Sequence, residues 1–159
     1  MTELISEFSE RQGISDFFGV ADAGVEEGDF ASDATIWDTG RPGPNSWIDV
    51  GPNGVTLSVE QGKRTYVRYE LWDGPPLPMD SSWGRSWEGE LFLASGRIVA
   101  VSYAGDEPDY YIPFDLGRQG ANWLVRICAK TPKNETDPEF PSNIYGADLF
   151  KLQFWLPRP

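Results

Sequence analysis

Apolar and polar side chains alternate with a period of two through most of this chain from residue 30 onward. The alternation is clearest over 64–72, where Thr65, Val67 and Tyr69 fall on one side and the intervening residues on the other. Successive side chains point to opposite faces in a β-strand, so this pattern predicts strands. Clusters of Gly, Pro, Asn and Asp separate the alternating segments and predict turns.

The predicted strands are numerous and short. They are 31–38, 46–50 with 54–59, 64–72, 87–94, 97–103, 110–116, 123–129 and 148–156. Ser95 and Gly96 predict a tight hairpin between two of them. The last strand is apolar on both faces, which predicts a central place in its sheet. About 7–8 strands at this spacing predict a mainly β fold, an antiparallel β-sandwich.

The N-terminal residues follow a different pattern. Over 2–19, apolar side chains such as Leu4, Phe8 and Phe17 recur at spacings near three and four, which predicts a short helical segment. Residues 19–29 are acidic and rich in glycine, which predicts a flexible linker. We therefore expect a helical and acidic segment over 1–29 and a β-sandwich domain over 30–159.

The residue inventory excludes several kinds of chemistry. The chain has no histidine and one cysteine, Cys128. Histidine-dependent triads and dyads and the usual zinc sites are therefore excluded, and there is no intrachain disulfide. Paired carboxylates are the remaining catalytic candidate: Glu88 and Glu90 share a strand face, with Glu70 on a strand we expect to be adjacent. Acids on an exposed sheet face are usually only solvated, so we expect a protein without catalytic activity or cofactor.

The charge of the chain favours a basic partner. The sequence holds 25 acidic and 13 basic side chains, and residues 1–50 hold 11 acidic and 2 basic ones. Such a surface repels nucleic acid, because phosphate binding requires cations. It attracts a basic protein and accelerates the encounter. Plain solubility is the alternative explanation. The acidic start lacks a signal peptide or an apolar span, which predicts a cytoplasmic protein without membrane contact.

Two further kinds of binding site remain open from the residues alone. Asp106, Glu107 and Asp109 share one loop and resemble the calcium-chelating loops of C2-like modules. Aromatic residues near loops, among them Trp83 and Trp87, are typical of carbohydrate-binding modules. Trp83 is the tryptophan hardest to place in a core, so we predict that it is an exposed contact residue.

A segment near the C-terminus resembles a known group of proteins. It consists of residues 111–116 (YIPFDL), then Gly120, Trp123, Val125 and Arg126, and a terminal Leu-Gln-Phe-Trp strand. In these features residues 54–156 resemble the competence protein J-like inhibitors of a DNA-entry nuclease and the immunity proteins of toxin systems. The resemblance implies a cytosolic inhibitor that acts by protein–protein contact. It implies no catalytic residue.

The charge and the resemblance together predict an acidic protein that inhibits or neutralises a basic partner, a nuclease or a toxin. The predicted partner-binding residues are Glu7, Glu10, Glu26, Glu27, Asp29, Asp33 and Trp83. We expect charge reversal at Glu26 and Glu27 to slow association with this partner and to weaken its salt dependence.

Overall fold

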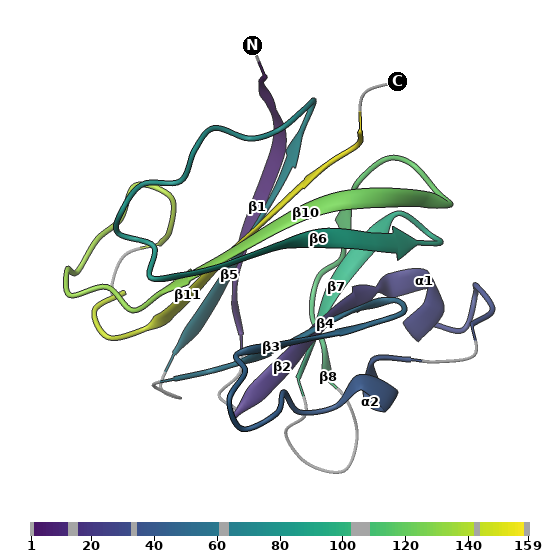
Figure 1. Ribbon diagram of the computed structural model, residues 1–159, viewed down its shortest axis with the longest axis horizontal. Helices are drawn as coiled ribbons and strands as arrows, with labels where there is room; N and C mark the ends of the chain where they lie inside the picture. Colours follow the sequence, from purple (N-terminus) through teal and green to yellow (C-terminus); the bar gives the residue numbers. More distant parts are fainter. Residues whose placement is uncertain are drawn as a thin grey trace. The chain divides into compact units, whose positions relative to one another are not determined.

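The computed structural model of the chain describes residues 2–12, 16–32, 35–60, 64–102, 109–141 and 144–157. Strands dominate these residues, and the two helices among them are four residues long (Figure 1). The elements in chain order are β1 (Leu4–Gln12), β2 (Phe17–Asp22), α1 (Ala23–Glu26), α2 (Ile36–Thr39), β3 (Ile48–Gly51), β4 (Gly54–Ser58), β5 (Thr65–Trp72), β6 (Arg85–Leu93), β7 (Arg97–Ser102), β8 (Asp109–Tyr110), β9 (Phe114–Asp115), β10 (Ala121–Lys130) and β11 (Asp148–Trp155).

The chain forms two compact units, each assembled from separated stretches of sequence. Unit 1 comprises Met1–Ile14, Gln61–Glu90 and Trp123–Pro159, and unit 2 comprises Ser15–Glu60 and Leu91–Asn122. The predicted division after residue 29 falls inside unit 2 and coincides with neither unit's limits. Residues 1–29 supply β1 to one sheet and β2 to the other, so they are part of the β structure.

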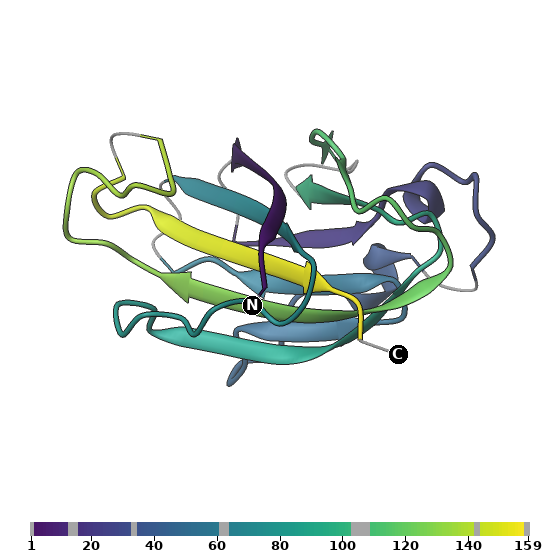
Figure 2. The same cartoon turned by 90° about the horizontal axis from the view of Figure 1, so that it is seen from above.

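The sheet of unit 1 has five strands in the order β1-β5-β11-β10-β6. Strands from the two ends of the chain flank β5, namely β1 (purple) and β11 (yellow) in Figure 1. Strand β11 lies between β5 and β10, as the view from above also shows (Figure 2). Seven of its eight residues are buried, which confirms the predicted central place. Its pairing with β5 is parallel, so the expectation of a purely antiparallel fold is wrong.

The sheet of unit 2 has six strands in the order β3-β4-β2-β7-β8, with β9 also paired with β7. Strand β2 is its centre, because it pairs with β4 on one side and with β7 on the other. Its residues Val20 and Ala21 are fully buried, as are Val55, Leu57 and Val101 of the neighbouring strands. The mainly β fold with two sheets is therefore confirmed, but the described strands outnumber the predicted 7–8.

The predicted N-terminal helix is wrong. Residues 4–12 form β1, which pairs along its length with β5. The ring of Phe8 stacks on that of Tyr69, with 6.3 Å between the ring centroids. A partner strand therefore decides the conformation of this segment, and tertiary pairing overrides the local spacing of apolar residues. The predicted flexible linker is wrong too, since residues 18–25 are buried in β2 and α1.

Two other local predictions are wrong for identifiable reasons. The segment predicted as a strand over 31–38 contains α2 instead, where the backbone N–H of Thr35 donates to the Asp38 carboxylate at 2.8 Å. This Thr-x-x-Asp spacing is a capping box, a helix signal within the alternating pattern. The turn at Ser95 and Gly96 does not form a hairpin, because β6 and β7 belong to different sheets.

Candidate functional site

One face of the unit 1 sheet carries a group of polar side chains that are almost completely buried. The strand register pairs Arg68 with Lys151, and it pairs Gln153 with both Glu70 and Arg126. Residues paired on adjacent strands share a face, so the alternation of three strands brings these five side chains together. Each is at most 9% exposed. Charged side chains are rarely buried to this extent unless they are paired.

Glu70 is at the centre of this group, and its carboxylate is fully engaged. Its Oε2 accepts a hydrogen bond from Nε of Arg68 at 2.7 Å. Its Oε1 accepts from Nε2 of Gln153 at 2.8 Å and from the indole N–H of Trp72 at 2.9 Å. Burial opposes ionisation, but these hydrogen bonds and the charge of Lys151 outweigh it and hold the pKa of Glu70 below its ordinary value.

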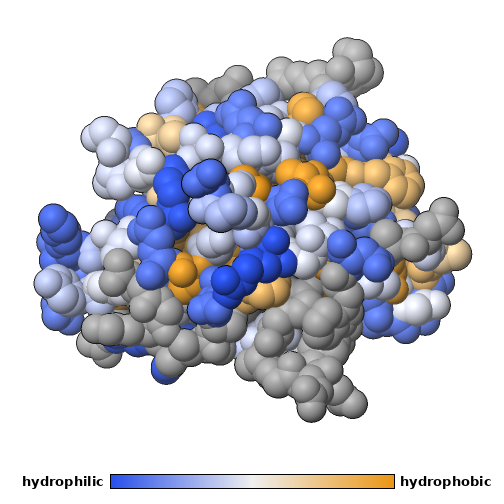
Figure 3. Space-filling view, turned by 60° about the horizontal axis from the view of Figure 1, so that its bottom comes forward, coloured by the Kyte–Doolittle hydropathy of each residue, from blue (hydrophilic) through white to orange (hydrophobic). Residues whose placement is uncertain are grey.

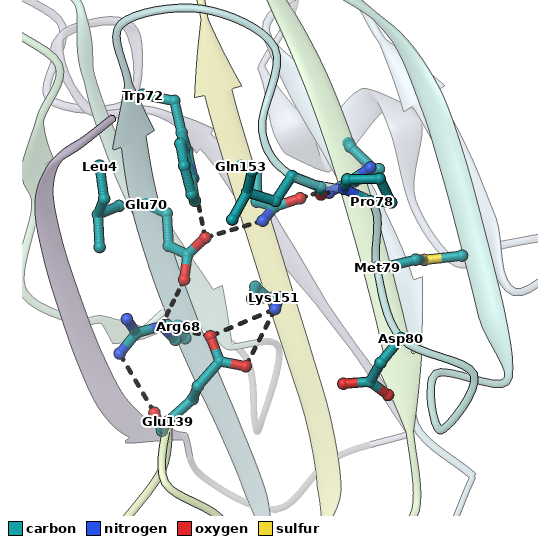
Figure 4. Close-up of a pocket in the computed structure, with 12 residues that line it drawn as sticks. Leu4, Arg68, Glu70, Trp72, Pro78, Met79, Asp80, Glu139, Lys151 and Gln153 are labelled. Carbon is teal, nitrogen blue, oxygen red and sulfur yellow. Dashed lines mark hydrogen bonds and ion pairs between the residues drawn. The ribbon is translucent and has the colours of Figure 1, made fainter. Parts of the chain in front are cut away.

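Arg68 and Lys151 of the sheet both bind Glu139, which belongs to the loop between β10 and β11. Nζ of Lys151 donates to both carboxylate oxygens of Glu139, at 3.1 and 3.3 Å, and Nη1 of Arg68 donates to the Glu139 backbone oxygen at 3.3 Å. Arg68 is also ion-paired with Glu7 of β1. Figure 4 shows both cations turned toward Glu139. Nε of Arg68 also lies 3.5 Å from Oε2 of Glu139, so Arg68 is paired with the carboxylates of Glu7, Glu70 and Glu139.

A cavity of about 300 Å³ lies over this polar group, and we refer to it as the Arg126 cavity. Charged and apolar side chains both line it, and all of them belong to unit 1 (Figure 4). The cavity is lined by Leu4, Arg68, Glu70, Trp72, Leu77, Pro78, Met79, Asp80, Arg126, Glu139, Lys151 and Gln153. The volume is at the small end of the range for ligand pockets.

Trp83 was predicted to be an exposed contact residue, and the prediction that it is exposed is wrong. Trp83 is 5% exposed and belongs to a buried cluster with Phe140 and Cys128, its ring centroid 6.2 Å from that of Phe140. The ammonium groups of Lys130 and Lys151 lie 4.2 and 4.9 Å from the centroid of its ring. A cation over an indole face is a favourable contact, so the loop tryptophan packs inward instead of facing solvent.

The single cysteine is part of the same buried cluster. Its Sγ lies 3.3 Å from Sδ of Met79. Burial raises the pKa of the Cys128 thiol, so it stays protonated at neutral pH. Cys128 is a core residue.

The two acids predicted on an N-terminal helix lie on β1 and face opposite ways. Glu7 pairs in the register with Glu70 and reaches Arg68 on the polar face. Glu10 is aligned with Val67 and faces the other side, toward Tyr69. Burial raises the pKa of Tyr69, and the Glu10 carboxylate adds to the effect. The helical spacing that would have placed both acids on one surface does not occur.

Glu26 of unit 2 is half buried and serves the contact between α1 and α2. Its Oε2 accepts a hydrogen bond from the backbone N–H of Ile36 at 3.3 Å, while its buried Oε1 has no partner among the described residues. Burial raises the pKa of Glu26, and the neighbouring Asp22 and Asp38 carboxylates raise it further. This carboxyl is therefore a poor candidate for an exposed anionic contact.

Glu27 and Asp29 differ from Glu26 in that both are exposed. Glu27 is ion-paired with Arg97, with 3.0 Å between Oε2 and Nη2, and this hydrogen bond lowers the pKa of Glu27. Both residues lie directly after α1, so the chain presents them together. Asp33, the remaining predicted acid, lies outside the described residues.

Asp22 is a buried acid that the sequence pattern did not single out. Its Oδ1 accepts from the backbone N–H of Val25 at 3.0 Å and from Oγ of Ser95 at 2.8 Å. Its Oδ2 accepts from the backbone N–H of Ser95 at 2.9 Å. Asp22 thus caps α1 and joins it to the 94–96 turn. An aspartate directly before a helix is the signal that would have identified it.

The negative charge of the chain is concentrated in unit 2. This unit holds 13 acidic and 3 basic side chains, a net charge of −10, whereas unit 1 holds 12 and 10, a net charge of −2.

On the face drawn in Figure 3, hydrophobic residues form small patches separated by hydrophilic ones. A partner that docks on this face therefore meets a largely polar surface.

The other candidate sites find little support among the described residues. These residues contain no group of three or more metal-ligating side chains, and Asp106 and Glu107 of the predicted calcium loop lie outside them. Glu70 is not on a strand adjacent to Glu88 and Glu90, because β11 and β10 separate β5 from β6. No tryptophan side chain that the structure describes is among the exposed large hydrophobic ones. No helix in the described part of the chain is long and apolar enough to cross a membrane.

This two-sheet fold has solved counterparts. The chain is similar to ComJ, inhibitor of the DNA-degrading activity of NucA from Bacillus subtilis, with a TM-score of 0.60, 10% identity and 99% of each chain covered. It is also similar to the product of crocagin biosynthetic gene J, with a TM-score of 0.58, 15% identity and 99% of each chain covered. No protein-family model and no curated protein matches the sequence. The predicted resemblance to the competence protein J-like inhibitors is confirmed at the level of the fold, over nearly the whole chain, and the resemblance to toxin immunity proteins stays a prediction.

Proposed function

We propose that this chain is an inhibitor that binds a basic protein, a nuclease or a toxin, through the acidic surface of unit 2. The observation that carries the proposal is the charge of that unit, −10 of the total −12. A surface with this charge attracts a cationic protein and increases the association rate. Nuclease substrate grooves are cationic because they hold phosphates, so an acidic protein fits them.

The fold supports the same role. ComJ, which inhibits the DNA-degrading activity of NucA, has this fold over 99% of both chains. A shared fold does not by itself transfer function, so the charge of unit 2 is the main support for this role and the fold is a second one. The proposal also places the protein in the cytoplasm, with no catalytic activity of its own and no nucleic acid or membrane as partner.

Among the predicted contact residues, we propose Glu27 and Asp29 as the first contacts. Both are exposed and lie on either side of Gly28 in the loop after α1. Glu26 is held against Ile36 and so contributes to the shape of this segment more than to its charge. Glu7, Glu10 and Asp33 stay as proposed secondary contacts. Trp83, being buried, contributes by supporting its loop.

The test begins with an affinity capture from cells of the source organism at low salt, with identification of the retained proteins. The association rate of the purified pair is then measured against ionic strength for the double variant Glu27→Lys with Asp29→Lys. We expect its rate at low salt to fall by about tenfold and its salt dependence to flatten, since steering contributes factors of about 10 or more.

The matched control is Glu88→Lys with Glu90→Lys. These acids are exposed on β6 in unit 1, so the control makes the same charge change elsewhere. We expect a much smaller change in rate. Equal rates for the two double variants would show that the contact is not on the unit 2 surface. A partner that is itself acidic would refute the proposal.

A further inference from the structure

Arg126 is a buried cation without a carboxylate partner in the part of the chain that the structure describes. It is 9% exposed, and its hydrogen-bond acceptors are both neutral: Oε1 of Gln153 at 2.7 Å from Nε and the backbone oxygen of Leu77 at 2.5 Å from Nη2. No carboxylate of the described residues lies within 4.0 Å of it. A guanidinium has five N–H groups, so three of those of Arg126 are unused by the described residues.

The other cations that line the Arg126 cavity are neutralised. Arg68 is paired with Glu7, Glu70 and Glu139, and Lys151 is paired with Glu139. Burial of an unpaired charge is costly, and proteins rarely retain one without an anion to match it. Arg126 is therefore the position in this cavity where a further negative charge gains most.

Two exposed apolar side chains line the cavity, one on β1 and one on the 73–84 loop. Leu4 is 38% exposed and Leu77 is 60% exposed, and both line the cavity with Trp72. They are two of the few large hydrophobic side chains that the described part of the chain leaves in solvent. Apolar lining residues in the same cavity as a guanidinium with unused N–H groups match a ligand with one anionic end and one hydrocarbon end.

We propose that the Arg126 cavity binds a small apolar carboxylate, with the carboxylate on Nη1 and Nη2 of Arg126 and the hydrocarbon part against Leu4, Trp72 and Leu77. A carboxylate accepts two parallel hydrogen bonds from a guanidinium, which makes it the best partner for the unused N–H groups. The cavity volume of about 300 Å³ limits the ligand to the size of a small metabolite. This site belongs to unit 1 and is independent of the acidic surface proposed to bind a protein partner.

The test uses octanoate and 4-phenylbutyrate as probes, each compared with the primary alcohol of the same carbon skeleton. Binding is measured by calorimetry and by the NMR shift of the Trp72 indole N–H, which donates to Glu70 beside the cavity. We expect both acids to bind the native chain and to bind more tightly than the alcohols. Arg126→Gln keeps a polar side chain at this position, and we expect it to reduce the affinity for the acids at least tenfold, about 1.4 kcal/mol.

Two controls separate binding from folding. Arg64→Gln removes another arginine with a neutral acceptor, the backbone oxygen of Tyr145 at 2.7 Å, and we expect no change in affinity. Leu77→Ser changes an exposed residue and does not disturb the core, and we expect it to weaken binding several-fold. Ile112→Ser changes an equally exposed residue of unit 2, and we expect it to have no effect on binding. Equal binding of acids and alcohols, or no loss in both Arg126→Gln and Leu77→Ser, would overturn the proposal. If Arg126→Gln does not fold, the acid–alcohol comparison and Leu77→Ser decide it.

Discussion

Unit 1 holds 12 acidic and 10 basic side chains, and unit 2 holds 13 and 3. Unit 1 buries several of its charges and pairs them, as at Arg68, Glu70 and Lys151. In unit 2, Asp22 is buried and satisfied by backbone and hydroxyl donors, while Glu27 and Asp29 stay in solvent, with Glu27 in a surface ion pair with Arg97. The two units thus hold nearly equal numbers of acids in different environments. Only unit 1 has enough cations to neutralise most of its acids inside the structure.

The charges of unit 1 therefore serve mainly to stabilise the fold, whereas the exposed acids of unit 2 are available for binding. A buried pair contributes little to the field outside the protein, whereas exposed acids without matching cations add to it over about a Debye length. Unit 2 is therefore the source of any long-range attraction for a basic partner. Unit 1 is where substitution of a charged residue should affect folding most.

The largest effect is expected for Arg68→Met. This change leaves Glu70, Glu139 and Glu7 without their shared cation, and removal of one partner from a buried ion pair costs about 3–5 kcal/mol. Urea unfolding monitored by fluorescence measures the loss. Arg64→Met, which removes a half-buried arginine directly before β5, should cost less than about 1 kcal/mol. Similar losses in the two variants would mean that the buried network is no more important than the surface.

An intermediate effect is expected for Asp22→Ala in unit 2. The change leaves the buried backbone N–H groups of Val25 and Ser95 without their acceptors, which costs about 1–3 kcal/mol. Asp29→Ala removes an exposed acid a few residues later and should change the free energy of unfolding by about 0.5 kcal/mol or less. Thermal unfolding of both variants measures the difference. If Asp22→Ala is as stable as the native chain, Asp22 does not stabilise the protein by capping α1.

The smallest effect is expected for Glu26→Gln, and a pH comparison with Glu70→Gln should show effects of opposite sign. The pKa of Glu70 is lowered in the folded state, so its carboxylate stabilises unit 1 above pH 4.5 and this contribution is lost as the pH falls through the folded pKa. The pKa of Glu26 is raised, so folding favours its protonated form and stability is lost as the pH rises through the folded pKa.

Glu70→Gln should therefore be less stable than the native chain at neutral pH, and Glu26→Gln more stable. Both differences should disappear in acid, where the native carboxyls are protonated. Urea unfolding at several pH values between 3 and 7 checks this. The same sign for both variants at neutral pH would contradict the assignment of one carboxyl as paired and the other as desolvated.

The strand pattern was predictable where it depends on one segment alone. The alternation over 64–72 predicted β5, and the two apolar faces of the last segment predicted the central place of β11. The N-terminal segment was not predictable in this way. Its apolar spacing fits a helix, and only the pairing with β5 and the contact of Phe8 with Tyr69 make it a strand.

The candidate sites follow the same division. The acidity of the region around Glu27 and Asp29 was visible in the composition, and the prediction of a basic partner depends on it. The Arg126 cavity was not visible, because Arg126, Glu70 and Lys151 come from three strands that are distant in the sequence. Trp83 looked exposed because it lies between serine and glycine in a turn-rich loop, but that loop folds back so that the ring meets Phe140 and two lysines.

The sequence by itself determined the mainly β class, the excess of acids and the absence of histidine chemistry, because these depend on composition and on the two-residue period of single strands. The tertiary structure alone decided which strands pair, that β5 and β11 run parallel, and that 10 of the 12 net negative charges fall in one unit. It also decided which carboxylates are neutralised. Pairing and burial depend on residues far apart in the chain, and their energies exist only once those residues are brought into contact.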